Sequence, residues 1–190
     1  MKILIAYALR EERIPLAVKG VRLVEVITGI GKTQAAASLA FAIAEHRPDV
    51  VLNIGTVGSY RHEVGDILVS RSFVDRDMQR LPIEGVSKQL DMSNQSFWEE
   101  LPSVVEGGES TAPMCINTGD NFVLTPEEDL GSDAVDMESF ALAWVCRKAG
   151  LPFLAVKYVT DKLGQNSVEA WAEKLKHARR DLQAYFEKYL

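Results

Sequence analysis

The sequence is poor in the residues that metal, redox and nucleic-acid sites need. It contains 2 cysteines, which form no C-x-x-C pair, and its 3 histidines are scattered as His46, His62 and His177. Metal sites need such ligands at short, regular spacings, so we expect no metal. The formal net charge is -6 without any Lys/Arg cluster, which argues against a nucleic-acid partner because phosphate contacts need a basic stripe. A small neutral or cationic ligand fits this composition better.

Long apolar runs are also missing. No segment approaches the roughly 20 apolar residues that a membrane-spanning helix needs, so we expect no membrane contact. Directly after Lys2 the chain reads ILIAYA, which is typical of a strand and not of a secretory signal. Cys115 and Cys146 have apolar neighbours and are expected to be reduced thiols in the core. These features together predict a cytoplasmic protein.

Several well-known motifs fail on inspection. GIGKT (residues 29–33) lacks the first glycine of a Walker loop, because Val26 stands in its place. The same segment has Gln34 where a dinucleotide fingerprint needs its third glycine. HEVGD (residues 62–66) has Asp66 where a zinc protease motif needs its second histidine, and the chain contains no G-x-S-x-G elbow. We therefore expect no ATP site, no dinucleotide and no other cofactor.

Strand-like and helix-like patterns alternate along the chain. The patterns predict strands over residues 2–8, 21–28, 50–54 and 66–74, and a helix over residues 32–46. A long polar region follows, with Pro82, Gly85, Gly107 and Gly108, and we expect loops and one short helix there. A closing amphipathic helix is predicted from apolar residues at spacings of three and four, namely Trp171, Leu175, Ala178, Leu182 and Phe186.

This alternation predicts the fold class. Strands that alternate with helices favour an α/β fold, with a mixed, mostly parallel central sheet covered by helices on both faces. A chain of 190 residues with 47% hydrophobic and 25% charged residues has the composition of one globular domain. We therefore expect a single three-layer α/β/α domain over residues 1–190.

Residues 133–161 place acids at both ends of a predicted helix–strand unit. The apolar run 154–159 follows a break at Gly150 and Pro152, which indicates a buried strand that finishes on Thr160 and Asp161. Ligands of open α/β sheets bind beyond the carboxyl ends of the strands, so Asp161 is a candidate for chemistry. Glu138 enters the preceding helix, where the partial positive charge of the helix start favours a carboxylate.

Four segments carry a family resemblance. They are TGIGK (residues 28–32), NIGTVGS (residues 53–59), VDMES (residues 135–139) and VKYVTD (residues 156–161). Together and in this order they make the chain resemble the nucleoside phosphorylase/nucleosidase superfamily. Within it the chain is most similar to the methylthioadenosine/S-adenosylhomocysteine nucleosidases and related purine nucleosidases. The resemblance implies a nucleoside phosphorylase-like fold, a small-molecule purine nucleoside as substrate, and a homodimer.

The resemblance also assigns catalytic roles. In the nucleosidases the aspartate of an SD or TD pair protonates N7 of the leaving purine, and Asp161 matches it after Thr160. The glutamate of the N-terminal acidic run activates the attacking water, which Glu12 matches, with its neighbour Glu11 as the alternative. Cleavage of an N-glycosidic bond passes through an oxocarbenium-like sugar, so it needs a proton for the base, an activated water and nearby negative charge. Carboxylates in different environments can divide these tasks.

Further residues are expected to bind the substrate. The family's MES segment holds the ribose 2′ and 3′ hydroxyls, which makes Glu138 the sugar clamp beside Met137. The family's GDxF segment supplies an aromatic that stacks on the purine, and Phe122 and Val123 match it. The remaining predicted substrate-binding residues are Thr56 and Gly58, expected just after the third strand, with Thr160 and Lys157.

Hydrolysis is favoured over phosphorolysis. Related phosphorylases bind phosphate with an arginine just before the GSxG-type turn, where this chain has Asn53, and with an N-terminal GDPxR loop that it lacks. Arg10 and Arg13 keep a phosphorylase as an alternative. Lys157 stands where the nucleosidases usually have arginine, which predicts altered 5′ recognition. A catalytically weak nucleoside-binding protein on the same scaffold is the other alternative.

Overall fold

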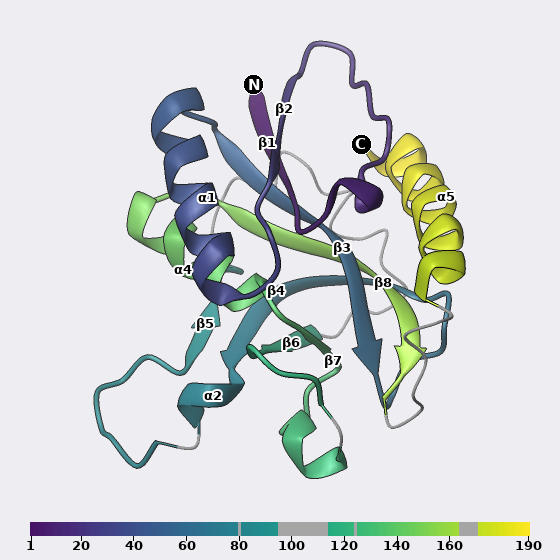
Figure 1. The fold of residues 1–190 in the computed structure, drawn as a ribbon. Helices are drawn as coiled ribbons and strands as arrows, with labels where there is room; N and C mark the ends of the chain where they lie inside the picture. The colour runs from purple at the N-terminus through teal and green to yellow at the C-terminus, as the bar shows by residue number, and fades with distance from the viewer. Residues whose placement is uncertain (80, 95–113, 124, 164–170) are drawn as a thin grey trace.

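A mixed sheet of 8 strands forms the centre of the computed structural model, which describes residues 1–79, 81–94, 114–123, 125–163 and 171–190 (Figure 1). The strands are β1 Lys2–Tyr7, β2 Arg22–Ile27, β3 Val50–Ser59, β4 Ile67–Asp75, β5 Gln89–Asp91, β6 Met114–Thr118, β7 Ala134–Asp136 and β8 Phe153–Lys162. The pairs β1–β2, β1–β3, β3–β8, β4–β6 and β6–β7 are parallel, while β3–β7, β4–β5 and β4–β8 are antiparallel. The predicted mixed, mostly parallel sheet is confirmed.

Part of the sheet closes on itself. Strand β3 pairs with β8, β8 with β4, β4 with β6, β6 with β7, and β7 returns to β3 through the pair Gly58 and Val135. Strands β1 and β2 extend the sheet from β3, and β5 extends it from β4. The sequence patterns did not predict this ring. Its consequence is that the carboxyl-terminal half of β3 lies beside β7, which carries Asp136.

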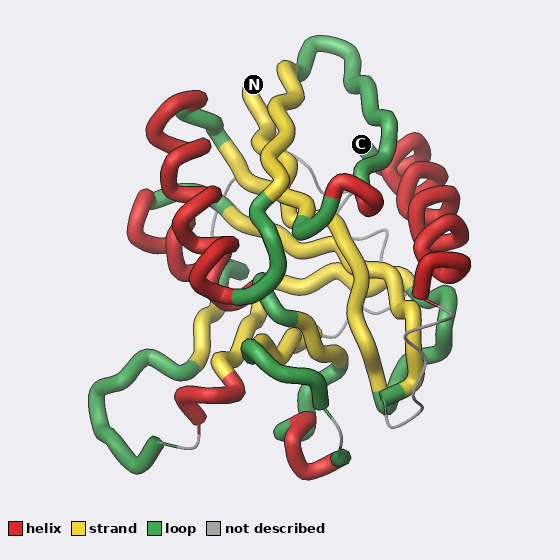
Figure 2. Tube along the Cα trace, in the orientation of Figure 1, coloured by secondary structure: helices red, strands yellow, loops and turns green. Residues whose placement is uncertain are grey.

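Helices cover both faces of the sheet (Figure 2). Helices α1 Lys32–His46 and α4 Ser139–Ala149 lie together on one side, and α5 Trp171–Tyr189 lies on the other. Shorter helical segments are η1 Arg10–Glu12, α2 Arg76–Gln79 and η3 Pro126–Asp129. The three-layer α/β/α arrangement is therefore as predicted.

The side chains of the central strands alternate between two apolar clusters. On β1, Leu4 and Ala6 pack in the cluster under α1 and α4, while Ile3, Ile5 and Tyr7 pack in the cluster under α5. All of these side chains are fully buried, as expected for strands covered on both faces. The amphipathic pattern of α5 is confirmed by its buried residues Leu175, Ala178, Leu182 and Phe186, whereas the side chain of Trp171 lies outside the described set.

Two sequence predictions were wrong. Strand β3 does not end at Ile54 but continues through Gly55, Thr56 and Gly58 to Ser59. The glycines are strand residues because other side chains approach them closely: a Cβ on Gly55 would lie 3.1 Å from Oε1 of Glu12. The region expected to hold loops and one short helix lies partly outside the described residues; its described part contains the short helix α2 and also β5, which was missed. The short strands β6 and β7 were missed as well, because three to five residues give too little alternation to recognise.

Within the described ranges, no helix is both long and apolar enough to cross a membrane. Cys115 and Cys146 are free thiols; Cys146 is buried as predicted, whereas Cys115, also expected in the core, is only half-buried. The pKa of both thiols is raised by burial.

Candidate functional site

Glu12 points into the protein from the short helix η1, directly after β1. Its side chain is 5% exposed, whereas its neighbour Glu11 is exposed. The carboxylate accepts hydrogen bonds from the backbone N–H of Leu9 at 3.1 Å and from both the N–H and the Oγ1 hydroxyl of Thr56, at 3.2 and 3.1 Å. Burial raises the pKa of Glu12, and the positive charge of Lys157 and these hydrogen bonds oppose the rise. Of the two neighbouring glutamates, only Glu12 is buried and bound to β3.

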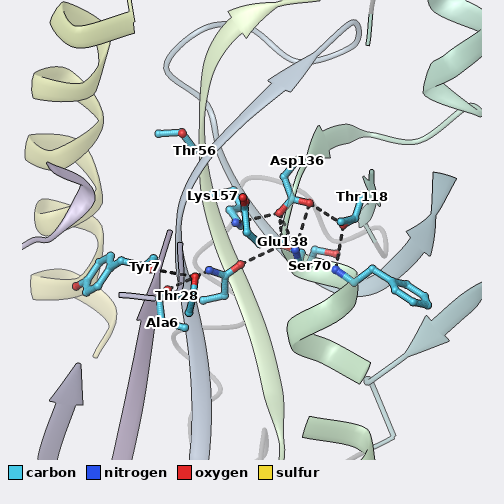
Figure 3. Close-up of polar contacts among 12 residues, drawn as sticks. Ala6, Tyr7, Thr28, Thr56, Ser70, Thr118, Asp136, Glu138 and Lys157 are labelled. Carbon is cyan, nitrogen blue, oxygen red and sulfur yellow. Dashed lines mark hydrogen bonds and ion pairs between the residues drawn. The ribbon is translucent and has the colours of Figure 1, made fainter. Parts of the chain in front are cut away.

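A buried ion pair lies beside Glu12. Lys157 on β8 and Asp136 on β7 are 3.1 Å apart between Nζ and Oδ2, and their side chains are 3% and 1% exposed. Figure 3 shows Lys157 and Thr118 approaching Asp136 from opposite sides. Asp136 also accepts hydrogen bonds from Oγ1 of Thr118 at 2.6 Å, and from the backbone N–H and the hydroxyl of Ser139. This aspartate therefore fixes Lys157, and no sequence pattern singled it out.

The ion pair yields a stability prediction. In the Asp136→Asn variant, Lys157 would keep a buried charge without its counter-charge, which typically costs about 3–5 kcal/mol. We expect a loss of that order in the free energy of unfolding, measured by urea denaturation at pH 7. The matched control is Glu63→Gln, which breaks the surface pair of Lys162 and Glu63, whose side chains are 26% and 77% exposed. That change should cost less than about 1 kcal/mol. Equal losses in the two variants would contradict the assignment.

Glu138 stands at the start of α4, as predicted, and its carboxylate is held by the beginning of another helix. Oε1 accepts a hydrogen bond from the backbone N–H of Gly31, the residue before α1, at 3.0 Å. Glu138 is 7% exposed, and its neighbour Met137 is half-buried. Burial and the negative charge of Asp136 raise the pKa of Glu138 to about 7, against the opposing charge of Lys157. Glu138 therefore titrates close to neutral pH.

This raised pKa predicts a pH-dependent stability. Between pH 4.5 and about 7 the folded protein keeps a proton on Glu138 that the unfolded chain releases, so raising the pH through this window favours unfolding. Glu138→Gln removes the titration. We expect the wild type to lose stability relative to this variant as the pH rises through the window, by up to roughly 3 kcal/mol at 1.36 kcal/mol per pKa unit. Denaturant unfolding at several pH values measures the difference. A difference that does not change with pH would refute the assignment.

Asp161 lies near the end of β8 at an irregularity in the sheet. Val57 pairs with Val159 and Gly58 pairs with Asp161, so Thr160 is an extra residue that bulges from the β3–β8 ladder. Thr160 donates a hydrogen bond from Oγ1 to Oδ1 of Asp161 at 2.7 Å. A Cβ on Gly58 would lie 3.0 Å from Oδ2 of Asp161 and 2.6 Å from Leu163, so the missing side chain leaves room for the carboxylate. Bulges of this kind redirect side chains near functional sites.

Most of the predicted residues gather around one stretch of β3. Thr56 holds Glu12, and Gly58, two residues further on, faces Asp161. Lys157 pairs in register with Gly55 and its charge acts on both Glu12 and Glu138. The arrangement thus gives three buried carboxylates, those of Glu12, Asp136 and Glu138, which interact with the buried ammonium group of Lys157, while Asp161 lies further along β8. Such a site can move a proton, orient a water molecule and stabilise a cationic sugar.

The loop after β6 adjoins this group. The backbone N–H of Gly119 donates to the carbonyl of Asp136 at 3.2 Å, and a Cβ on Gly31 would lie 3.1 Å from Oδ1 of Asp120. At the end of the loop Val123 is buried, whereas Phe122 is 75% exposed. Phe122 was predicted to define the base pocket. In the structure it is an exposed apolar ring on a loop next to the site, and its contact with the base stays a prediction.

Comparison with known proteins identifies the family to which the chain belongs. A sequence model described as the phosphorylase superfamily matches residues 13–190. The chain belongs to the phosphorylase superfamily. A 5′-methylthioadenosine/S-adenosylhomocysteine nucleosidase from Staphylococcus aureus is 32% identical over 166 residues, which cover 77% of this chain and 73% of the relative. The family prediction is confirmed, and with it the prediction that this superfamily member is an enzyme, an N-glycosidase of the nucleosidase type.

Solved structures of the superfamily share the fold. One is a 5′-methylthioadenosine/S-adenosylhomocysteine nucleosidase from Colwellia psychrerythraea in complex with adenine. It aligns with a TM-score of 0.79 at 22% identity, and the alignment covers 100% of this chain and 96% of that chain. The futalosine hydrolase of Helicobacter pylori aligns with a TM-score of 0.78 at 21% identity, over 98% and 97% of the two chains. The nucleoside phosphorylase-like fold predicted from the four segments is confirmed.

Proposed function

We propose that this superfamily member hydrolyses the N-glycosidic bond of a purine nucleoside and releases the free base. The observation that carries the proposal is the pair of buried carboxylates, Glu12 and Glu138, whose pKa values are both raised by burial and lowered by the charge of Lys157. Buried acids with raised pKa values are typical of catalytic sites.

Each carboxylate has a distinct task in this proposal. Asp161 donates a proton to N7 of the leaving purine. Glu12, fixed by three hydrogen bonds, accepts a proton from the attacking water. Glu138 accepts hydrogen bonds from the ribose hydroxyls beside Met137. Because the sugar becomes cationic as the bond breaks, the ionised carboxylates also stabilise the transition state.

The contacts of the residues that could have bound phosphate support water as the nucleophile. Asn53, at the position where related phosphorylases have arginine, donates to the carbonyl of Ala6 at 3.0 Å and accepts from the hydroxyl of Ser139 at 3.0 Å. Arg13 donates to Glu25 at 2.8 Å on the surface, and Arg10 is exposed. These groups are engaged elsewhere or directed to solvent, which disfavours a phosphate site built from them.

Lys157 has a different task from the one expected of it. Its Nζ is bound to Asp136, and its charge stabilises the ionised forms of Glu12 and Glu138. We therefore assign Lys157 to holding the charge state of the two glutamates instead of binding the 5′ substituent. A lysine suits this task because it acts as a compact point charge, whereas arginine would present a planar fork.

The names of the relatives direct the choice of substrate. Several are named 5′-methylthioadenosine/S-adenosylhomocysteine nucleosidases, and one structural neighbour is a futalosine hydrolase. The test is base release, followed by chromatography, from methylthioadenosine, S-adenosylhomocysteine, adenosine, inosine and futalosine. We expect release of the base from at least one 5′-modified nucleoside, with a kcat/KM higher than those for adenosine and inosine. Binding of these nucleosides without any release would instead support the nucleoside-binding alternative.

We further propose a homodimer that works in the cytoplasm. Helix α1 exposes Phe41 at 77%, and Ile30 just before it is 47% exposed, so a second copy of the chain could cover these apolar side chains. The free thiols Cys115 and Cys146 suit a reducing compartment. Sedimentation analysis tests the dimer, because a monomer at micromolar concentration would contradict it.

A further inference from the structure

Arg76 is an unusual residue in this fold. It is the first residue of the four-residue helix α2, directly after β4, and among the described residues it is the largest fully buried side chain, at 2% exposure. Arginine is rarely buried to this extent unless its donors meet acceptors, since an uncompensated charge is costly away from water. The contacts of its guanidinium therefore indicate what the residue is for.

The guanidinium joins the end of β6 to the loop that follows it. Nη1 donates to Oδ1 of Asn117, the second-to-last residue of the strand, at 3.2 Å. Nη2 donates to Oδ1 of Asn121 at 3.1 Å and also to its backbone carbonyl. Between them, Gly119 lies directly against the guanidinium, because a Cβ there would be 2.6 Å from both Cζ and Nη2. Only a glycine leaves space for Arg76 under this loop.

Asp120 holds the same loop from the other side. Oδ1 of Asp120 accepts from the backbone N–H of Lys32 at 2.7 Å, and the Asp120 N–H donates to Oδ2 of Asp77 at 3.2 Å. Nζ of Lys32 in turn joins Asp75 at 2.9 Å and Asp77 at 2.7 Å. Residues 119–121 are thus fixed between α1 and α2. The next residue, Phe122, is the one that extends into solvent at 75% exposure.

We propose that Arg76 is a positioning residue that sets the place of Phe122 and Val123 by holding Asn117 and Asn121. The inference rests on the proposed function and on the expectation, implied by the family resemblance, that these two residues contact the purine. Arg76 does not act on the reacting atoms, because the carboxylates assigned to chemistry belong to other elements, Glu12 to η1 and Asp161 to β8. Its effect should therefore fall on affinity for the base.

The expected result is a separation of KM from kcat. Arg76→Gln removes the charge and shortens the reach to Asn121, so the loop loses its anchor while the chemical groups stay in place. We expect the Kd for adenine, measured by calorimetry, and the KM for methylthioadenosine to rise about 10-fold, as expected for a lost charge-assisted hydrogen bond. The kcat should change by less than about 3-fold, the pattern of a lost ground-state contact.

One further variant and a control keep this test decisive. Asn121→Ala removes one acceptor but keeps the backbone carbonyl, so it should give a smaller rise in the same two constants. Arg147→Gln is the matched control, because Arg147 on α4 donates to a backbone carbonyl, that of Asp91, which belongs to β5 and not to this loop. Its Kd for adenine and its KM should equal those of the wild type.

The possible outcomes separate the two proposals. If Arg76→Gln and Asn121→Ala lower the Tm but leave the Kd for adenine unchanged, Arg76 is only structural and the inference is overturned. A wild type that binds adenine but releases no base contradicts the proposed function alone, because the adenine Kd of the variants still tests Arg76. A folded wild type that binds no adenine overturns both.

Discussion

Replacing Asp161 by asparagine is expected to reduce kcat for base release about 10²- to 10⁴-fold, the usual contribution of a positioned general acid. Asparagine has nearly the same shape and can still accept the hydrogen bond from Oγ1 of Thr160. It cannot deliver a proton to the leaving purine. Single-turnover base release measures the loss, and the Kd for adenine should change by less than about 3-fold.

The neighbouring residue provides the control for this prediction. Lys162→Gln changes the next position of β8 but removes only a surface pair with Glu63. Its kcat should stay within about 2-fold of the wild-type value, as expected for a change remote from a positioned catalytic group. If Asp161→Asn retained kcat within 10-fold of wild type, the bulge at Thr160 would not be serving a general acid, and the assignment of Asp161 would fail.

Replacing Glu12 by glutamine should also reduce kcat about 10²- to 10⁴-fold, since glutamine cannot accept a proton from water. The structure offers a closely matched control in Glu11→Gln. Both changes remove one negative charge from adjacent positions, yet Glu12 is buried against Thr56 whereas Glu11 is exposed. We expect Glu11→Gln to leave kcat close to the wild-type value. Comparable losses in the two variants would show that the general charge of the segment matters and not the position of Glu12.

The same variant has a pH signature. A general base works only when ionised, so the wild-type kcat should fall as the pH is lowered through the pKa of Glu12. Burial raises this pKa above the ordinary value of 4.5, so the acid limb should lie above pH 4.5. The residual activity of Glu12→Gln should lack this limb. An unchanged acid limb in the variant would assign the titration to another group.

The sequence was sufficient to predict where some candidate site residues lie relative to the strands and helices. Glu12 follows the first strand, Glu138 precedes a helix and Asp161 ends a strand, and such positions follow from local pattern. Local pattern could not decide between Glu11 and Glu12, because the orientation of a short 3₁₀ segment depends on what it packs against. The contact with Thr56 on β3, which is distant in the sequence, shows that Glu12 is the glutamate directed into the protein.

Asp136 and Arg76 could not be recognised in advance for a related reason. A charged residue in a polar stretch is usually exposed, so sequence alone favours a surface position for both. Their burial depends on partners that only the fold supplies: Lys157 for Asp136, and Asn117 and Asn121 for Arg76. Gly55 and Gly58 were misread for the opposite reason. Glycine usually marks a break, but here it leaves room for side chains that cross a continuous strand.

The most direct test of the central claim is the origin of the oxygen atom in the sugar product. The enzyme would be incubated with methylthioadenosine and inorganic phosphate in water enriched in ¹⁸O, and the products would be analysed by mass spectrometry within the first turnovers. Hydrolysis assisted by Glu12 predicts free adenine and a methylthioribose that carries one ¹⁸O atom at C1, at a rate independent of phosphate. A methylthioribose 1-phosphate, formed only when phosphate is present, would contradict the account.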